Sequence, residues 1–226
     1  MRLIFILFCS LFHIIPINLT GSETNYSGWP ENLNTARNTA YLNKLEQQVI
    51  LELNKVRSNP KQFAEDYLEE LLTAYNGKLY TYPGQDPVNS HEGIGPLKEC
   101  IQVLKNTDSR PILQPSVGLS KGANELVEDQ QRNGGIGHIS RNGLNPQKRI
   151  EKYGEWDICS AEDITYGSFE ARQIVIALLI DDGVPDRGHR KNILDPCFHF
   201  AGVADGTHPH YQSMCVIDYA GKYQSK

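Results

Sequence analysis

The strongest constraint on the fold is the order of two periodicities along the chain. Helix-like spacing comes first: between residues 42 and 56, apolar side chains recur every three or four positions, which places them on one helical face. Strand-like segments come last, over residues 198–204 and 211–219. We predict that they form an antiparallel hairpin that turns at Asp205-Gly206. This order indicates an α+β domain, in which helices cover both faces of a small antiparallel sheet.

Further elements follow from capping residues, breakers and apolar stretches. The expected helices are 60–72 after the bend before Pro60, 94–106, 116–132 capped by Ser116, 145–153, and 168–181 capped by Ser168. The apolar block 174–180 is apolar nearly all round, which is typical of a helix buried on both sides. A central strand is the alternative, because β-branched residues are frequent there. We expect a strand over 158–166 and a long loop over 74–96.

The N-terminus has the features of a secretory signal peptide. An apolar run follows Arg2 and ends at Pro16, about thirteen residues later, which is short of the roughly twenty needed to cross a bilayer. A retained anchor is the alternative. We therefore divide the chain into a signal peptide (1–21), a polar, irregular N-terminal arm (22–40) and one folded domain (41–226).

Charge and hydropathy limit the possible partners. Without Arg2, the one charged residue of the segment 1–21, 21 basic residues face 27 acidic ones, a formal charge of −6. Nucleic acid and anionic membranes are therefore poor candidate partners. No later segment is apolar enough to span a membrane, so we expect a secreted, extracellular protein.

Five cysteines become four once Cys9 is removed with the signal peptide. An even number in an oxidising compartment predicts two disulfides. A hairpin centred on Asp205-Gly206 would place Cys197 opposite Cys215, which leaves Cys100 to pair with Cys159. The alternative is a pair of free, buried thiols. Asn25-Tyr26-Ser27 is a glycosylation sequon that survives cleavage, so we expect a glycoprotein.

Three short segments place a charged or metal-capable residue beside glycine: His138 after Gly137, Glu162 ahead of Gly167, and His189 after Gly188. Imidazole and carboxylate groups can together hold Zn²⁺ or polarise water. Taken alone, each histidine is more often a hydrogen-bonded structural residue, so only a fold that brings the segments together would make them one site.

The order of these segments resembles a known family. Gly137-His138, residues 161–164, an apolar helix, residues 188–194 (Gly-His-Arg-Lys-Asn-Ile-Leu) and residues 200–204 together look like the CAP superfamily of cysteine-rich secretory proteins, antigen 5 and pathogenesis-related 1 proteins. The resemblance implies a three-layer α–β–α sandwich with a cleft around His138, Glu162 and His189. The Gly-His-Arg-Lys form is similar to the bacterial and plant-like branch.

The sequence departs from the family pattern at the second cleft carboxylate. The family usually has a glutamate on the helix before the last histidine, whereas no glutamate lies between Glu170 and His189. Asp181 or Asp182 is the nearest candidate to complete the cleft. Ala161 and Asp163 also replace the residues that flank the family's first glutamate.

Three functions remain open. The resemblance implies a non-enzymatic extracellular protein whose cleft holds a divalent metal, such as Zn²⁺ on His138 and His189, and which binds lipid, sterol or another protein. The alternative is a zinc-dependent hydrolase with Glu162 as general base. A third interpretation treats the cleft as a buried polar network that orders the core. No nucleophile motif is present, and we interpret His208-Pro209-His210 as a solvated turn rather than a metal site.

Overall fold

The computed structural model describes residues 28–81 and 87–226. The signal peptide expected at 1–21 and the sequon at Asn25 lie outside these residues. Within the described ranges, no helix has both the length and the apolar character that crossing a membrane requires.

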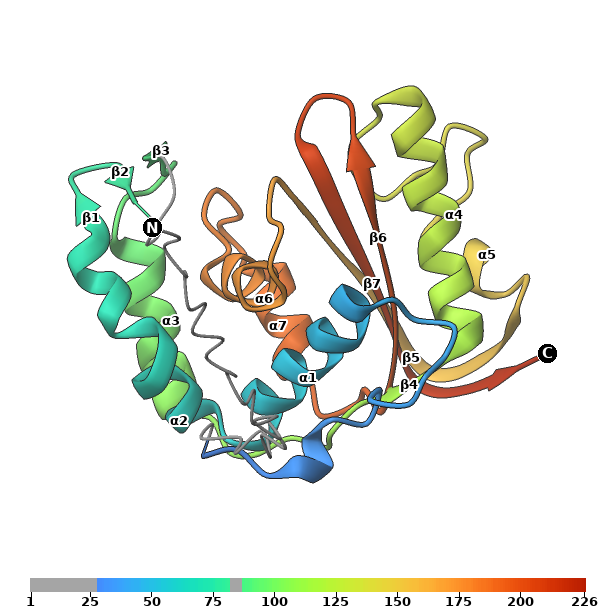
Figure 1. Cartoon of the computed structure of the whole chain (residues 1–226), viewed down its shortest axis with the longest axis horizontal. Helices are drawn as coiled ribbons and strands as arrows, with labels where there is room; N and C mark the ends of the chain where they lie inside the picture. Colours follow the sequence, from blue (N-terminus) through green and yellow to red (C-terminus); the bar gives the residue numbers. More distant parts are fainter. Residues whose placement is uncertain (1–27, 82–86) are drawn as a thin grey trace, which may run out of the picture.

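A four-stranded sheet with strand order β4-β6-β7-β5 forms the centre of the fold (Figure 1). Its strands are β4 (Gln114–Pro115), β5 (Gly154–Tyr166), β6 (Phe200–His208) and β7 (Gln212–Ser225). β7 pairs antiparallel with both β5 and β6, while the short β4 runs parallel to β6. The C-terminal hairpin is therefore the middle of the sheet, and β5 is an edge strand.

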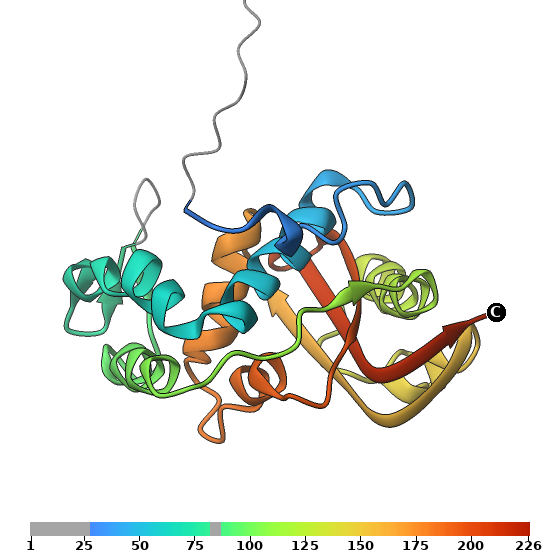
Figure 2. The same cartoon turned by 90° about the horizontal axis from the view of Figure 1, so that it is seen from below.

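Helices cover both faces of this sheet. One face carries α4 (Val117–Asn133) and α5 (Pro146–Ile150), and the other carries α1 (Lys44–Ser58), α6 (Ala171–Ile180) and α7 (Gly188–Leu194). Beyond α1 and α6 lies a further group: α2 (Pro60–Phe63), the short turns η2 (Ala64–Leu68) and η3 (Glu70–Ala74), and α3 (Gly95–Lys105). Figures 1 and 2 show these groups on opposite sides of the strands. The expected α–β–α sandwich is confirmed.

The segment expected to be a long loop contains a small second sheet. It consists of β1 (Tyr75–Asn76), β2 (Leu79–Tyr80) and β3 (Val88–Asn89), paired antiparallel in that order. On the N-terminal side, the 3-10 turn η1 (Glu31–Leu33) and the residues after it contribute Leu33 and Ala36 to the core. Part of the polar arm therefore packs against the domain.

Helix prediction from apolar spacing was largely correct. α1 begins after a capping box in which the Asn43 side chain accepts from the Glu46 N–H, while the Glu46 carboxylate accepts from the Asn43 N–H. The apolar block 174–180 is a buried helix, as preferred over a central strand. Ser168 does not cap it, since the cap residue is Glu170. The helix expected over 60–72 is divided into a short α-helix, a π-helical turn and a 3-10 turn.

The turn expected at Asp205-Gly206 was wrong, because both residues lie inside β6. The strands instead reverse between His208 and Gln212. A Cβ on Gly206 would come within 2.5 Å of a Val127 methyl group on α4. Glycine is therefore needed here for the close approach of helix and strand rather than for a turn.

The expected disulfides were wrong for the same reason. With the turn at 208–212, Cys215 lies opposite Asp205 and faces the core, and Cys100 is buried in α3; both are free thiols. Cys159 and Cys197 form the disulfide observed among the described residues. A β-bulge between Asp157 and Ser160 brings Cys159 beside the entrance to β6, which no local pattern in the sequence indicates.

Candidate functional site

Glu162 forms the centre of one half of the candidate site, on the face of β5 that packs against α4 and α5. Its Oε1 lies 2.8 Å from Nδ1 of His138, and its Oε2 pairs with the guanidinium of Arg149. Glu162 and Arg149 are buried, whereas 46% of the His138 side chain is exposed. Arg149 also donates to the carbonyl oxygens of His138 (2.9 Å) and Leu144 (3.1 Å). One buried cation thus fixes both the carboxylate and the loop that carries the histidine.

A second buried carboxyl group lies beside this half. Asp218 on β7 is directly opposite Glu162 on β5 and is fully buried. Burial and the negative charge of Glu162 raise the pKa of Asp218 well above its usual value, so the uncharged form of this carboxyl group is favoured here. The sequence analysis missed both Asp218 and Arg149. An aspartate inside the apolar stretch 214–220 was the available signal.

His189 and Asp181 form the other half, on the opposite face of β5. Asp181 ends α6 in a left-handed conformation, with φ of 58°. Its Oδ1 lies 2.6 Å from Nδ1 of His189, and its Oδ2 accepts from the His189 backbone N–H at 2.9 Å. Asp181 therefore orients the imidazole and also accepts a hydrogen bond from a main-chain N–H at the start of α7, which has no partner within the helix.

Charge near His189 favours the imidazolium form. Burial by itself lowers the pKa of His189, but the hydrogen bond to Asp181 and the negative charges of Asp163, Asp181 and Asp186 outweigh it, and the net pKa is raised. Asp163 is fully buried, and desolvation raises its pKa to about 7. It accepts a hydrogen bond of 2.7 Å from the Asn192 side chain of α7, which connects β5 to this half.

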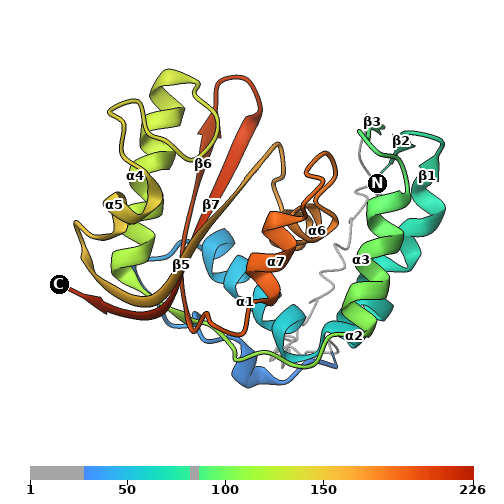
Figure 3. The ribbon, with the colours of Figure 1, turned by 180° about the vertical axis from the view of Figure 1, so that it is seen from behind.

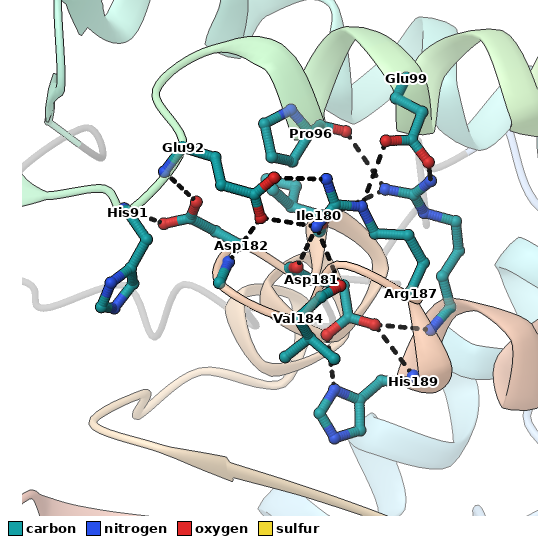
Figure 4. Close-up of polar contacts among 12 residues, drawn as sticks. His91, Glu92, Pro96, Glu99, Ile180, Asp181, Asp182, Val184, Arg187 and His189 are labelled. Atoms are coloured by element: carbon teal, nitrogen blue, oxygen red, sulfur yellow. Dashed lines mark hydrogen bonds and ion pairs between the residues drawn. The ribbon is translucent and has the colours of Figure 1, made fainter.

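The structure decides between the two aspartates that the sequence left open. Asp181 contacts His189, whereas Asp182 accepts from the backbone N–H groups of His91 (2.7 Å) and Glu92 (2.9 Å). Glu92 in turn forms a double ion pair with Arg187 at 2.7 and 2.8 Å, which holds the pKa of Glu92 near 2. Figure 4 shows these contacts joining the loop before α3 to the loop before α7. Asp182 therefore clamps two loops, whereas Asp181 is the aspartate that contacts His189.

The two halves do not combine into one ligand set. Glu162 and Asp163 are consecutive residues of an extended strand, so their side chains point to opposite faces. Each histidine has its Nδ1 occupied by a carboxylate, which leaves one Nε2 on each side. Over residues 28–81 and 87–226, no group of three or more His, Cys, Asp or Glu side chains is placed to hold a metal ion. The donor set does not fit a zinc centre with three protein ligands.

A pocket of about 440 Å³ lies beside the His189 half. Its walls come from the small sheet, α6, the end of β5 and the tip of the C-terminal hairpin. Most of the lining is aromatic or aliphatic: Tyr75, Tyr80, Val88, Ile164, Tyr166, Ala177, Leu178, Ile180 and Tyr211. Ser90 also lines it, and its Oγ is buried without a hydrogen-bond partner. A second hollow of about 330 Å³ shares Tyr80, Val88 and Ala177 and extends the pocket along α6.

The prediction of a solvated turn at 208–210 was wrong for His208. Its side chain is buried, its Nε2 lies 2.8 Å from the Gly135 carbonyl oxygen, and its Nδ1 accepts from the His210 N–H at 3.2 Å. Both ring nitrogens are therefore used in fixing the hairpin tip to the end of α4. His210 itself is exposed.

Comparisons with known proteins agree with the order of motifs. A family model described as the cysteine-rich secretory protein family (CAP) matches residues 31–219. Among curated proteins, no match was found. An outer surface protein from Borrelia burgdorferi is 20% identical over 57% of this chain and 89% of its own, with a TM-score of 0.41. An extracellular SCP-domain protein from Bacillus anthracis is 18% identical over 50% of this chain and 35% of its own, with a TM-score of 0.39.

Proposed function

Because the chain belongs to the cysteine-rich secretory protein (CAP) family, we propose that it acts outside the cell as a non-enzymatic binding protein. Its ligand occupies the pocket beside His189. The observation that carries this proposal is the pocket itself, a preformed hollow of about 440 Å³. Its walls are mainly aromatic and aliphatic, and its polar lining residues are Asn89, Ser90, His91, Thr165, Asp181, Asp182 and His189. This is the usual composition of a ligand site in a protein.

Two features support an extracellular location. The disulfide between Cys159 and Cys197 is of a kind that persists in oxidising compartments and is rare in the cytosol of most organisms. The apolar run near the N-terminus has the length and flanking residues of a secretory signal peptide. Secretion and glycosylation at Asn25 remain predictions, which mass spectrometry of protein from its source can check.

The arrangement of carboxylates gives the hydrolase alternative little support. A general base needs a carboxylate that can take up a proton from a bound water. Both oxygens of Glu162 are occupied, one by Arg149 and one by His138. The two carboxylate oxygens of Asp181 contact the ring Nδ1 of His189 and the main-chain N–H of the same residue, at the start of α7. We derive no catalytic step from these residues, and the enzymatic function stays a weaker prediction.

Zinc binding is a separate prediction that the same histidines allow to be tested. Each free Nε2 can offer one ligand, so we expect weak binding at most. Calorimetric titration of the wild type beside a His138→Ala, His189→Ala double variant measures this directly. Equal affinity in the two proteins would show that neither histidine is a ligand.

The binding proposal is tested by filling the pocket. Ala177 is exposed on α6 and lines both hollows, so Ala177→Trp fills the site from a surface position with little cost to folding. Val103→Trp on α3 is the matched control, because Val103 is exposed and lines no described pocket. The probe is an apolar fluorescent dye such as anilinonaphthalene sulfonate. We expect Ala177→Trp to weaken dye binding at least tenfold and the control to leave it unchanged; equal binding in both variants would contradict the proposal.

A further inference from the structure

The outer edge of β5 carries main-chain groups that the sheet does not use. β5 is the last strand in the order β4-β6-β7-β5 and, within residues 28–81 and 87–226, pairs with β7 alone. In Figure 3 it lies on the near side of the sheet, with α6 and α7 to one side and α4 and α5 to the other. A β-bulge between Asp157 and Ser160 interrupts its first half. Because bulges prevent edge-to-edge pairing, the regular half from Ser160 to Tyr166 is the part of the edge that another strand could pair with. Ile164 and Thr165 are only 7% and 8% exposed, so such a strand would have to enter the cleft that the flanking helices form.

The direction of these groups follows from the hydrogen bond at the end of the strand. The Gly167 N–H donates to the Ser213 carbonyl oxygen at 3.0 Å, so residue 167 faces β7. Along an antiparallel pair, residues alternate between facing the partner and facing away. Asp163 and Thr165 therefore face β7, while Ile164 and Tyr166 point their N–H and C=O groups outward. Among the described residues, no turn, loop or side chain is hydrogen-bonded to these outward main-chain groups.

The pocket lies against this same edge. Ile164, Thr165 and Tyr166 all line it, although successive side chains of a strand point to opposite faces. Three consecutive residues share one pocket because the pocket reaches the edge of the strand near its C-terminal end. The apolar hollow and the row of unused main-chain groups are therefore parts of one surface.

We propose that the ligand is an extended polypeptide segment, which adds a strand to the outer edge of β5; this inference rests on the binding function proposed above. A peptide main chain offers N–H donors and C=O acceptors at the same spacing as the outward groups of Ile164 and Tyr166. In strand addition of this kind, main-chain hydrogen bonds give the affinity, and pockets for alternate side chains give the specificity. A lipid or sterol has one polar end and cannot use a row of alternating N–H and C=O groups.

The two faces of β5 set the sequence that such a segment must have. Ligand side chains opposite Thr165 point to the α6 side, toward Ala177 and Ile180 in the pocket. Those opposite Ile164 point to the other face, where Ile139 is 58% exposed on the loop that carries His138. We therefore infer a ligand with apolar residues at alternate positions facing α6, and smaller or polar residues between them.

The test uses ten-residue peptides selected by phage display from a random library against the folded mature protein. Amide hydrogen exchange is then followed by NMR with and without the best peptide. We expect the amides of Ile164 and Tyr166 to exchange faster than those of Asp163 and Thr165 in the free protein and to become at least tenfold slower with peptide bound. The amides of Asp163 and Thr165 already bond to β7, so they act as internal controls and should change little.

N-methylation of the peptide provides a second, independent measurement. Methyl groups on the amides that face β5 should weaken binding at least tenfold, whereas methyl groups on the alternate amides should have little effect. Failure to select any peptide, equal loss at all positions, or protection elsewhere on the protein would each overturn the inference. If the dye still binds and Ala177→Trp still blocks it, the pocket remains a ligand site and only the peptide assignment fails.

Discussion

Arg149 offers the sharpest test of the structure, because it is a fully buried cation whose partners all belong to the candidate site. Its guanidinium pairs with Glu162 and donates to the carbonyl oxygens of His138 and Leu144. Arg149→Met keeps much of the side-chain volume but removes the charge and every one of these hydrogen bonds. It leaves the Glu162 carboxylate buried beside Asp218 with no cation.

The expected cost follows from that unpaired charge. Breaking a buried ion pair by removing one partner destabilises a protein by about 3–5 kcal/mol. For a domain of this size, each kcal/mol lowers the midpoint of thermal unfolding by about 2–4 °C. We therefore expect the melting temperature of Arg149→Met to fall by roughly 6–20 °C. The loop that carries His138 should also lose order, because its carbonyl groups lose their donor.

A double-mutant cycle in urea separates the ion pair from general loss of packing. Glu162→Gln alone leaves Arg149 buried without a counter-charge and should also destabilise the fold. The double variant removes both charges, so its loss should be smaller than the sum of the single losses by at least about 2 kcal/mol. Additive losses, or a cost below about 1 kcal/mol for Arg149→Met, would refute the assignment of this pair as the centre of the half-site.

Three further predictions concern the other half-site and the disulfide. Asp181→Asn removes the charge beside His189 and should lower the pKa of that histidine, whereas Asp182→Asn should leave it unchanged; NMR titration of the imidazole measures both. Burial raises the pKa of Asp163 to about 7, so its stabilising effect is complete below pH 4 and is lost as the pH rises through 7. Asp163→Asn should reduce this pH dependence of the free energy of unfolding, measured in urea, by up to about 4 kcal/mol across the window. Cys197→Ser opens a loop of 38 residues and should cost about 4 kcal/mol in denaturant unfolding.

Some parts of the fold were determined by local sequence patterns. Apolar spacing was enough to predict α1, α4 and α6, because a helix satisfies its main-chain hydrogen bonds within its own segment. The predicted side-chain caps did not form, since neither Ser116 nor Ser168 makes a capping hydrogen bond. The order of short motifs indicated the family and the sandwich fold. The pairing of His138 with Glu162 and of His189 with Asp181 also involved residues that the sequence had singled out.

Other features depended on contacts between distant segments. The glycine at 206 suggested a turn, yet it is needed for contact with α4, and moving the turn changed the partner of Cys215. Asp182 accepts a hydrogen bond from His91, which lies more than ninety positions away in the sequence. No local pattern could show that Asp181, rather than Asp182, contacts His189.

The sequence by itself determined most of the helices, the sandwich, and His138, Glu162 and His189 as candidate site residues. Only the tertiary structure decided that the cleft has two separate halves. Glu162 and Asp163 are neighbours in the chain, but the pleat of a strand points their side chains to opposite faces, and different helices supply their partners. Strand register, the open edge of β5 and the burial of Arg149 arise from packing between segments that local patterns do not specify.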